Sequence, residues 1–337
     1  MAKRLFAPEK KRRWGLILLP ILLLVIILSA LFINNALNSY PKMKRLMVTV
    51  PSLPNKAEGL TLLHISDLDG NMYGENQERL MVELKNQNYH GVFVTGDITD
   101  KNGSASAMIE IKNNLPSDIP VFYIPGDEDP SVMTDSGYSS WVGSLINAGC
   151  ILVDRPIKWE VSGTVVWVLP GNLLTADIEA MRFSIEQSDV SSDVSDYNKR
   201  IYADIDAAKM EMLNEHMYIA MSHAPFGDDN LAYLRDEGEM RMRNFPGRLM
   251  LLLSGHLCNG QARLPYFGAI YAPKTSLYEG EGFFKKDIRF SGLFTMRAVV
   301  QHISPGLGDS KIYPPWLPIR LFNPPEITLL KLTQDYY

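Results

Sequence analysis

Cysteine is scarce in this chain, whose 337 residues include only Cys150 and Cys258. Two cysteines are too few for the disulfide framework that stabilises many small secreted domains, although one bridge between them stays open at this level. Low-complexity segments and internal repeats are also lacking, which argues against a disordered chain. With 46% hydrophobic residues, a chain of this length can bury a substantial core.

The main part of the chain also lacks an excess of basic residues. The net charge is −5, and residues 1–45 hold nine Lys or Arg and one acid, a net of +8, so the remaining residues carry −13. A nucleic-acid-binding domain needs a basic face to neutralise phosphates. This acidic balance excludes nucleic acid as the expected partner.

Long apolar runs are rare, and the one that stands out covers residues 14–33, WGLILLPILLLVIILSALFI. It is uncharged and long enough to cross a bilayer as a helix, in which Pro20 is tolerated. Six Lys or Arg residues precede it and fewer follow nearby, which predicts a single-pass protein of the cell membrane with a cytoplasmic N-terminus and an extracytoplasmic domain. A cleavable signal peptide is the alternative, but no A-x-A-like site follows the run, which favours an uncleaved signal-anchor.

We therefore divide the chain into a basic cytoplasmic N-terminus (1–13), a transmembrane helix (14–33), a linker (34–57) and one large domain (58–337). The linker assignment depends on Pro41, Pro51 and Pro54, which prevent a continuous helix. From residue 60 onward, apolar strand-like runs at 60–66, 91–97 and 121–127 alternate with helical patterns at 75–87, 105–114 and 138–147. This alternation predicts an α/β domain with a parallel sheet covered on both faces.

Later strands are expected at 164–169, 217–222, 250–254, 294–303 and 327–332. The region 174–215 is the least regular and contains helix-like pieces. Within it, the polar stretch 188–196, SDVSSDVSD, is most simply a solvated loop.

Side chains that can bind metal follow five of the predicted strands, and ligands of such sheets bind beyond the carboxyl ends of the strands. These side chains are Asp67 and Asp69 in HISDLDG, Asp97 and Asp100 in VTGDITD, Asp127, Glu128 and Asp129 in PGDED, His223 in MSHAPF, and His256 and Cys258 in LLSGHLCNGQ. A single aspartate after a strand is usually a turn residue or a helix cap. Five such segments in succession at equivalent positions indicate a metal site instead.

The order and spacing of these motifs resemble those of the calcineurin-like metallophosphoesterases, especially their membrane-anchored bacterial branch. The family pattern is D-x-H, G-D-x-x-D, G-N-H-D/E, a histidine after a strand, and G-H-x-H-G-G-Q. The matching segments are 67–69, 96–100, 126–129, 223 and 255–261, and the closing segments SPGLG and LPIRLFNPPEI are also similar. The resemblance covers about residues 60–332 and implies a two-sheet αββα sandwich of the metallophosphoesterase type, preceded by one N-terminal transmembrane helix.

The resemblance also implies two divalent metal ions (Mn, Mg, Fe or Zn) at the ends of the sheets, with Asp97 as the bridging ligand. One ion would be held by Asp67, Asp69, Asp97 and Cys258, and the other by Asp97, Asp127, His223 and His256. Two ions about 3.5–4 Å apart clamp a phosphoryl group and activate a hydroxide that attacks phosphorus. The implied reaction is hydrolysis of a phosphate mono- or diester, and the expected substrate is lipid-linked or cell-envelope-linked.

Four motif positions differ from the family. Asp69, Glu128 and Cys258 stand where the family has histidine, and Asp127 stands where it has asparagine. The extra carboxylates make the site more negative, which weakens its attraction for phosphate. Glu128 is the expected catalytic residue, since the family histidine at its position steadies the phosphoryl group or protonates the leaving group.

An anionic glutamate at this position opposes phosphate binding unless it is protonated. The sequence therefore predicts a phosphoesterase that is slow beside relatives with complete motifs. The alternative is a catalytically impaired pseudoenzyme of the same fold that binds a partner at the membrane surface.

Residues 67–78, DLDGNMYGENQE, also match the oxygen-ligand spacing of an EF-hand calcium loop at Asp67, Asp69, Asn71 and Glu78. The sixth position of such a loop requires glycine for a sharp turn, and Met72 stands there. The preceding segment has the pattern of a strand, where an EF-hand has a helix. A calcium loop is therefore the lesser alternative.

Overall fold

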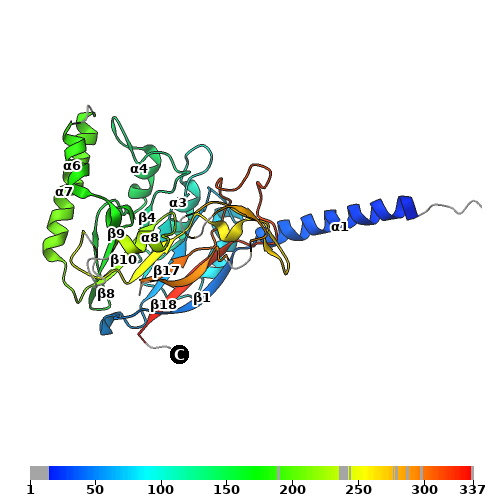
Figure 1. Ribbon diagram of the computed structural model, residues 1–337, viewed down its shortest axis with the longest axis horizontal. Helices are drawn as coiled ribbons and strands as arrows, with labels where there is room; N and C mark the ends of the chain where they lie inside the picture. The colour runs from blue at the N-terminus through cyan, green and yellow to red at the C-terminus, as the bar shows by residue number, and fades with distance from the viewer. Residues whose placement is uncertain are drawn as a thin grey trace, which may run out of the picture.

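The computed structural model describes residues 15–187, 190–234, 242, 244–275, 277, 280–285, 288–296 and 299–334. The basic N-terminus predicted at 1–13 lies outside these residues. Two six-stranded sheets form the centre of the domain, and helix α1 (Gly15–Asn38) projects away from it (Figure 1). The α/β class and the apolar N-terminal helix predicted from the sequence are therefore confirmed.

The first sheet has the strand order β1-β18-β2-β3-β4-β7. Its strands are β1 (Lys42–Thr49), β18 (Glu326–Thr333), β2 (Thr61–Ile65), β3 (Gly91–Thr95), β4 (Val121–Ile124) and β7 (Cys150–Leu152). Neighbouring strands are parallel except for β18 and β2, which are antiparallel. Every residue of β2, β3 and β4 is buried, as unbroken apolar runs predict for strands covered on both faces.

The second sheet has the order β16-β17-β11-β10-β9-β8. Its strands are β16 (Gly292–Met296), β17 (Val299–Ile303), β11 (Leu251–Ser254), β10 (Met217–Ser222), β9 (Thr164–Pro170) and β8 (Ile157–Val161). The prediction of one strand over 294–303 is wrong, because this segment contains parts of two strands that pair antiparallel with each other. The sequence pattern of this segment does not show that it belongs to two strands.

A shared core joins the two sheets. Leu62, Phe93 and Phe122 of the first sheet belong to the same buried cluster as Ile219 and Leu251 of the second. The rings of Phe93 and Phe122 have centroids 5.2 Å apart. Burying each such side chain contributes about 1.5–3 kcal/mol, so the contact between the sheets is a main source of the stability of the domain.

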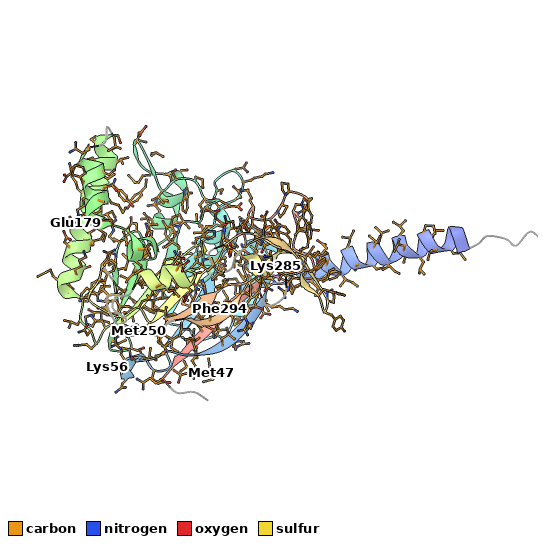
Figure 2. The ribbon with its side chains drawn as sticks, viewed as in Figure 1. Met47, Lys56, Glu179, Met250, Lys285 and Phe294 are labelled. Atoms are coloured by element: carbon orange, nitrogen blue, oxygen red, sulfur yellow. The ribbon has the colours of Figure 1, made fainter. Side chains whose placement is uncertain are left out.

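Helices cover the outer face of each sheet. The first sheet packs against α2 (Glu78–Leu84), α3 (Ser106–Asn114) and α4 (Ser140–Asn147), and the second against α5 (Asn172–Thr175), α6 (Ile178–Gln187), α7 (Ser192–Glu211) and α8 (Asp228–Tyr233). The described layers are therefore helices, sheet, sheet and helices. Figure 2 shows the side chains that fill the space between these layers and labels Met250, which directly precedes β11, and Phe294 on β16.

Three short hairpins and three 3-10 turns complete the elements found among the described residues. The hairpins are β5 (Met133–Thr134) with β6 (Gly137–Tyr138), β12 (Arg263–Leu264) with β13 (Gly268–Ala269), and β14 (Tyr271–Ala272) with β15 (Gly282–Phe283). The 3-10 turns are η1 (Asn55–Ala57), η2 (Glu75–Gln77) and η3 (Cys258–Gly260). Both cysteines of the chain are free and buried, so the bridge left open above is not formed.

Residues 34–57, predicted as a linker, instead hold the last residues of α1, the strand β1 and η1. Strand β1 pairs in parallel with β18 over its whole length, so the folded domain begins at Lys42. The proline argument missed this strand because Pro41 and Pro51 flank it and do not interrupt it.

The polar stretch 188–196, predicted as a loop, is also partly helical, because α7 begins at Ser192. The hydroxyl of Ser191 accepts a hydrogen bond from the backbone N–H of Val194 and caps this helix. Serine and aspartate favour helix N-termini as well as loops, so their presence alone did not distinguish the two.

Candidate metal centre

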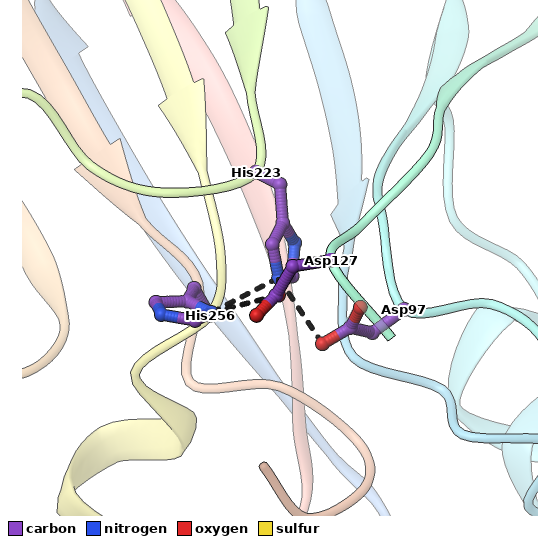
Figure 3. Close-up of side chains that lie close together, drawn as sticks. All are labelled: Asp97, Asp127, His223 and His256. Atoms are coloured by element: carbon purple, nitrogen blue, oxygen red, sulfur yellow. Dashed lines mark hydrogen bonds and ion pairs between the residues drawn. The ribbon is translucent and has the colours of Figure 1, made fainter. Parts of the chain in front are cut away.

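The loops after four strands bring four metal-binding side chains together between the two sheets (Figure 3). Asp97 follows β3 and Asp127 lies beyond β4 in the first sheet, while His223 follows β10 and His256 lies beyond β11 in the second. One ligand atom of each residue lies within 4.8 Å of the corresponding atoms of the other three. Carboxylate and imidazole are common ligands of divalent transition metals.

The contacts inside this cluster are short. His223 Nε2 lies 2.8 Å from Asp127 Oδ1 and 3.1 Å from Asp97 Oδ2. His256 Nδ1 lies 3.2 Å from Asp127 Oδ1 and 3.1 Å from His223 Nε2. The four atoms therefore face a common point, where a single cation could replace the protons that the two imidazoles share with the carboxylates.

A backbone hydrogen bond sets the tautomer of His223. Its Nδ1 lies 2.8 Å from the carbonyl oxygen of Thr95, and because a carbonyl only accepts, Nδ1 must carry a proton. Nε2 is thereby left to face the cluster, as is usual for a metal-binding histidine. Burial opposes the charged form, but the carboxylates of Asp127 and Asp97 raise the pKa of His223 well above its ordinary value.

Asp127 shows the reciprocal effect. Hydrogen bonds from His223 and His256 hold the pKa of Asp127 well below its usual range. Its carboxylate is therefore anionic at neutral pH and available to a cation.

Two aspartates beside the cluster, Asp67 and Asp69, each have a buried Oδ2 without a hydrogen-bond partner among the described residues. Burial raises the pKa of Asp67 to about 6, and burial with the charges of Asp67 and Asp97 raises the pKa of Asp69 to about 9. A buried carboxylate without a partner is costly, and a divalent cation is the kind of group that would satisfy these oxygens. The residues present therefore fit a metal.

Cys258 is completely buried in η3. Burial, with the charge of Asp67, raises the pKa of its thiol well above the ordinary value. Only the thiolate is a good metal ligand, so the thiol needs a bound cation to release its proton. The convergent group found among the described residues includes neither Cys258 nor Asp67 and Asp69. The structure thus gathers four of the seven ligands predicted from the sequence into one tight group.

Five of the candidate ligands have an unusual backbone conformation. The φ angles of Asp67, Asp69, Asp97, His256 and Cys258 are 49°, 50°, 49°, 72° and 41°. A residue other than glycine in this left-handed region costs about 1–3 kcal/mol, and such strain is concentrated at functional sites. This conformation recurs at the ends of β2, β3 and β11, where these candidate ligands lie.

The acidic loop PGDED distributes its three carboxylates among different partners. Asp129 accepts hydrogen bonds from the backbone N–H groups of Gly126, Ile98 and Thr99 and from the Thr99 hydroxyl, at 2.8–2.9 Å. These bonds tie the loop after β4 to the loop after β3. Glycine is required at Gly126, because a Cβ there would lie 2.0 Å from Asp97 Oδ1.

Glu128 is neutralised by a residue from the distant C-terminal part of the chain. Its backbone N–H donates to Asp97 Oδ1 at 3.0 Å. Its carboxylate accepts from the backbone N–H of Lys311 and forms an ion pair with Lys311 Nζ. The hydrogen bond to Glu128 raises the pKa of Lys311. Sequence reasoning missed this partner because 183 residues separate the pair.

A pocket of about 690 Å³ lies beside the centre. Its lining includes Asp69, Glu128, Lys311, Tyr313 and Leu317. It therefore runs from the candidate ligands to the loop after β17. Asp100 also borders this pocket, but its Oδ1 accepts from the backbone N–H groups of Asn102 and Ser104 and stabilises its own turn.

The calcium-loop alternative is wrong. Strand β2, and no helix, precedes residues 67–78, so the helix–loop–helix of an EF-hand does not form. Asp67 is completely buried against the cluster, whereas Glu78 is exposed at the start of α2.

Comparison with protein-family models found no match, and comparison with curated proteins found none either. Among solved structures, one similar chain is the phosphopantetheinyl hydrolase PptH from Mycobacterium tuberculosis, at 12% identity and a TM-score of 0.38. The alignment covers 83% of this chain and 99% of that one. At this level of similarity, the neighbour supports no conclusion about what this protein binds or does.

Proposed function

We propose that this protein is a membrane-anchored, metal-dependent phosphoesterase with the two-sheet αββα sandwich of the calcineurin-like metallophosphoesterases. The observation that carries the proposal is the convergence of Asp97, Asp127, His223 and His256 from four different strand ends. Aspartates that merely form turns have no reason to meet histidines from another sheet at this distance.

Two sets of side chains would hold the metals. The histidine-containing set is Asp97, Asp127, His223 and His256, and the carboxylate-rich set is Asp67, Asp69, Asp97 and Cys258. Asp97 is the shared ligand. The first set suits Mn, Fe or Zn, and the second suits a harder ion such as Mn or Mg. When bound, such ions polarise a phosphoryl oxygen and lower the pKa of a nearby water.

The residues of the chain prepare this site for an anionic substrate. Thr95 orients the ring of His223 through its carbonyl oxygen. Lys311 offsets the charge of Glu128 at the pocket wall, which reduces the repulsion that a lone glutamate would exert on a phosphate. Glu128, proposed as the catalytic residue, thus acts together with Lys311, whose side chain is 78% exposed and can meet a phosphoryl oxygen.

The test combines metal content with hydrolysis. The full chain, purified in detergent and supplied with Mn, Mg, Fe or Zn, should bind metal and hydrolyse bis(p-nitrophenyl) phosphate or p-nitrophenyl phosphate. Asp97→Asn should abolish both properties. Asp100→Asn, in the same G-D-x-x-D motif but outside the cluster, should preserve them. A chain that binds no metal, or equal activity of the two variants, would refute the proposal.

A second candidate is a pseudoenzyme of the same fold that binds a partner at the membrane surface. It is favoured by the ion pair between Glu128 and Lys311. Glu128 stands where the family has its catalytic histidine, and here it is engaged in a contact within the protein. Full metal occupancy without hydrolysis of either substrate would support this second candidate.

A further inference from the structure

The C-terminal end of α1 is fastened to the folded domain. Asn34 Nδ2 and Asn38 Nδ2 both donate to the carbonyl oxygen of Arg320, each at 2.9 Å. Asn34 Oδ1 accepts from the backbone N–H of Phe322 at 2.7 Å. The two asparagines are one helical turn apart, so these bonds fix the direction in which α1 leaves the domain.

The same contacts locate the surface of the membrane that α1 is proposed to enter. The apolar run ends at Ile33, and amide side chains follow at once. Amides are unfavourable in the hydrocarbon region, so its boundary falls near Asn34, at the level of Arg320. Leu31 of the apolar run and Ile319 line one crevice of about 460 Å³ between α1 and the domain. The loop after β17 therefore reaches the depth of the bilayer interface.

Exposed apolar side chains gather at this end of the domain. We call them the aromatic rim, and they are Tyr266, Phe267, Phe283, Phe284, Trp316 and Ile319. Trp316 is 56% exposed, Phe283 61% and Phe267 74%. They come from the segments around β12–β15 and from the loop after β17, near the base of α1, where Figure 2 labels Lys285.

The rim is held together by ring contacts. Trp316 stacks on Phe283 with centroids 5.5 Å apart and an interplanar angle of 20°. Tyr271 meets both rings edge-on, at 5.9 Å and 5.4 Å. Phe267 and Phe284 form a second pair at 6.5 Å. Soluble surfaces rarely expose a contiguous apolar patch of this kind, whereas aromatic side chains are enriched where proteins meet the bilayer interface.

The pocket beside the metal centre extends to the same loop. Asp69 and Glu128 line one part of it, and Pro315 and Leu317, the neighbours of Trp316, line another. We propose that the aromatic rim docks into the bilayer interface beside α1 and holds this pocket at the level of the lipid headgroups. The phosphate esters that reach the centre are then those of membrane lipids. This inference rests on the proposed anchor and site, and the bilayer is the occupant because the rim is continuous with the helix that enters it.

Fluorescence quenching in the full chain, reconstituted in phosphatidylcholine nanodiscs, tests the proposal. An environment-sensitive fluorophore is attached to single cysteines introduced by Leu28→Cys, Trp316→Cys, Lys101→Cys and Phe183→Cys; both native cysteines are buried. The label at position 28 reports on the anchor, and the label at position 316 reports on the aromatic rim. The label at position 101 reports on the wall of the pocket. Phe183 is the matched control, an aromatic residue 66% exposed on α6, which lies at the end of the domain far from α1 (Figure 1).

Acyl-chain nitroxide lipids should quench the labels at Leu28 and Trp316 strongly, and headgroup nitroxide lipids should quench the label at Lys101. The label at Phe183 should respond to neither. If Leu28 is quenched but Trp316 and Lys101 respond as weakly as Phe183, the anchor holds and the docking proposal is refuted. If Leu28 is not quenched either, the proposed membrane anchoring itself fails, and the docking proposal with it.

Discussion

A buried pair of histidines between the two sheets should make the domain sensitive to acid. His64 on β2 and His302 on β17 are buried, and their Nδ1 atoms lie 2.7 Å apart. One Nδ1 must donate and the other accept, so the accepting ring is neutral when the pair is formed. His64 Nε2 also lies 2.9 Å from Thr95 Oγ1, and the carbonyl of Thr95 orients His223. The pair therefore supports a strand end of the candidate metal centre.

The size of the effect follows from the pKa of His302. Burial, with the charge of Lys44, lowers this pKa from 6.5 to about 3. Between these values the unfolded chain binds more protons than the folded chain, so the free energy of unfolding falls as the pH falls through 6.5. At pH 5 the loss relative to pH 7 is about 2 kcal/mol from this one group. Burial and His302 also lower the pKa of His64, which adds to the loss in the same direction.

The perturbation that isolates this effect is His302→Asn. The asparagine amide can still bond to His64 Nδ1, but it does not titrate. Urea unfolding of the full chain in detergent with EDTA, at pH 7 and pH 5, should show a drop in stability that is about 2 kcal/mol smaller in the variant than in the parent. His90→Asn replaces a partly exposed histidine that also bonds to the backbone and should leave the drop unchanged. If the free energy of unfolding falls by the same amount between pH 7 and pH 5 in the parent and in His302→Asn, the reasoning is refuted.

The candidate metal centre and the anchor give four more expected outcomes. His256→Ala should lower the metal content of the purified chain, measured by elemental mass spectrometry, whereas Asp100→Asn should not. Lys311→Met should raise KM for bis(p-nitrophenyl) phosphate about fivefold, the upper end for an exposed ion pair, and Glu128→Gln in that background should cancel the change. The quadruple variant Asp69→His, Asp127→Asn, Glu128→His and Cys258→His should have a turnover number at saturating manganese about 10²–10³ times that of the parent. Equal turnover numbers would mean that the acidic residues form a working catalytic site. A cysteine introduced by Met210→Cys should react with a membrane-impermeant maleimide on intact spheroplasts, and reaction only after lysis would reverse the proposed topology.

Composition and periodicity determined much of this protein by themselves. The apolar run of α1 and the buried strands β2, β3, β4, β10 and β11 follow from local patterns, because continuous burial requires continuous apolar sequence. The common edge at which Asp97 and Asp127 lie also followed from the sequence, since parallel strands place their carboxyl ends together. The sequence therefore specifies the residue types that could bind metal.

Only the tertiary structure decided which distant groups meet. Lys311 neutralises Glu128 across 183 residues, and Arg320 holds Asn34 across 286. His64 and His302 pair across 238 residues, and β1 joins its sheet through β18 at the other end of the chain. Hydrophobic periodicity reports whether one face of a segment is buried, but the partner of a polar group depends on how segments far apart in the chain pack in space. That packing also decided that Cys258 stands outside the tight group of ligands.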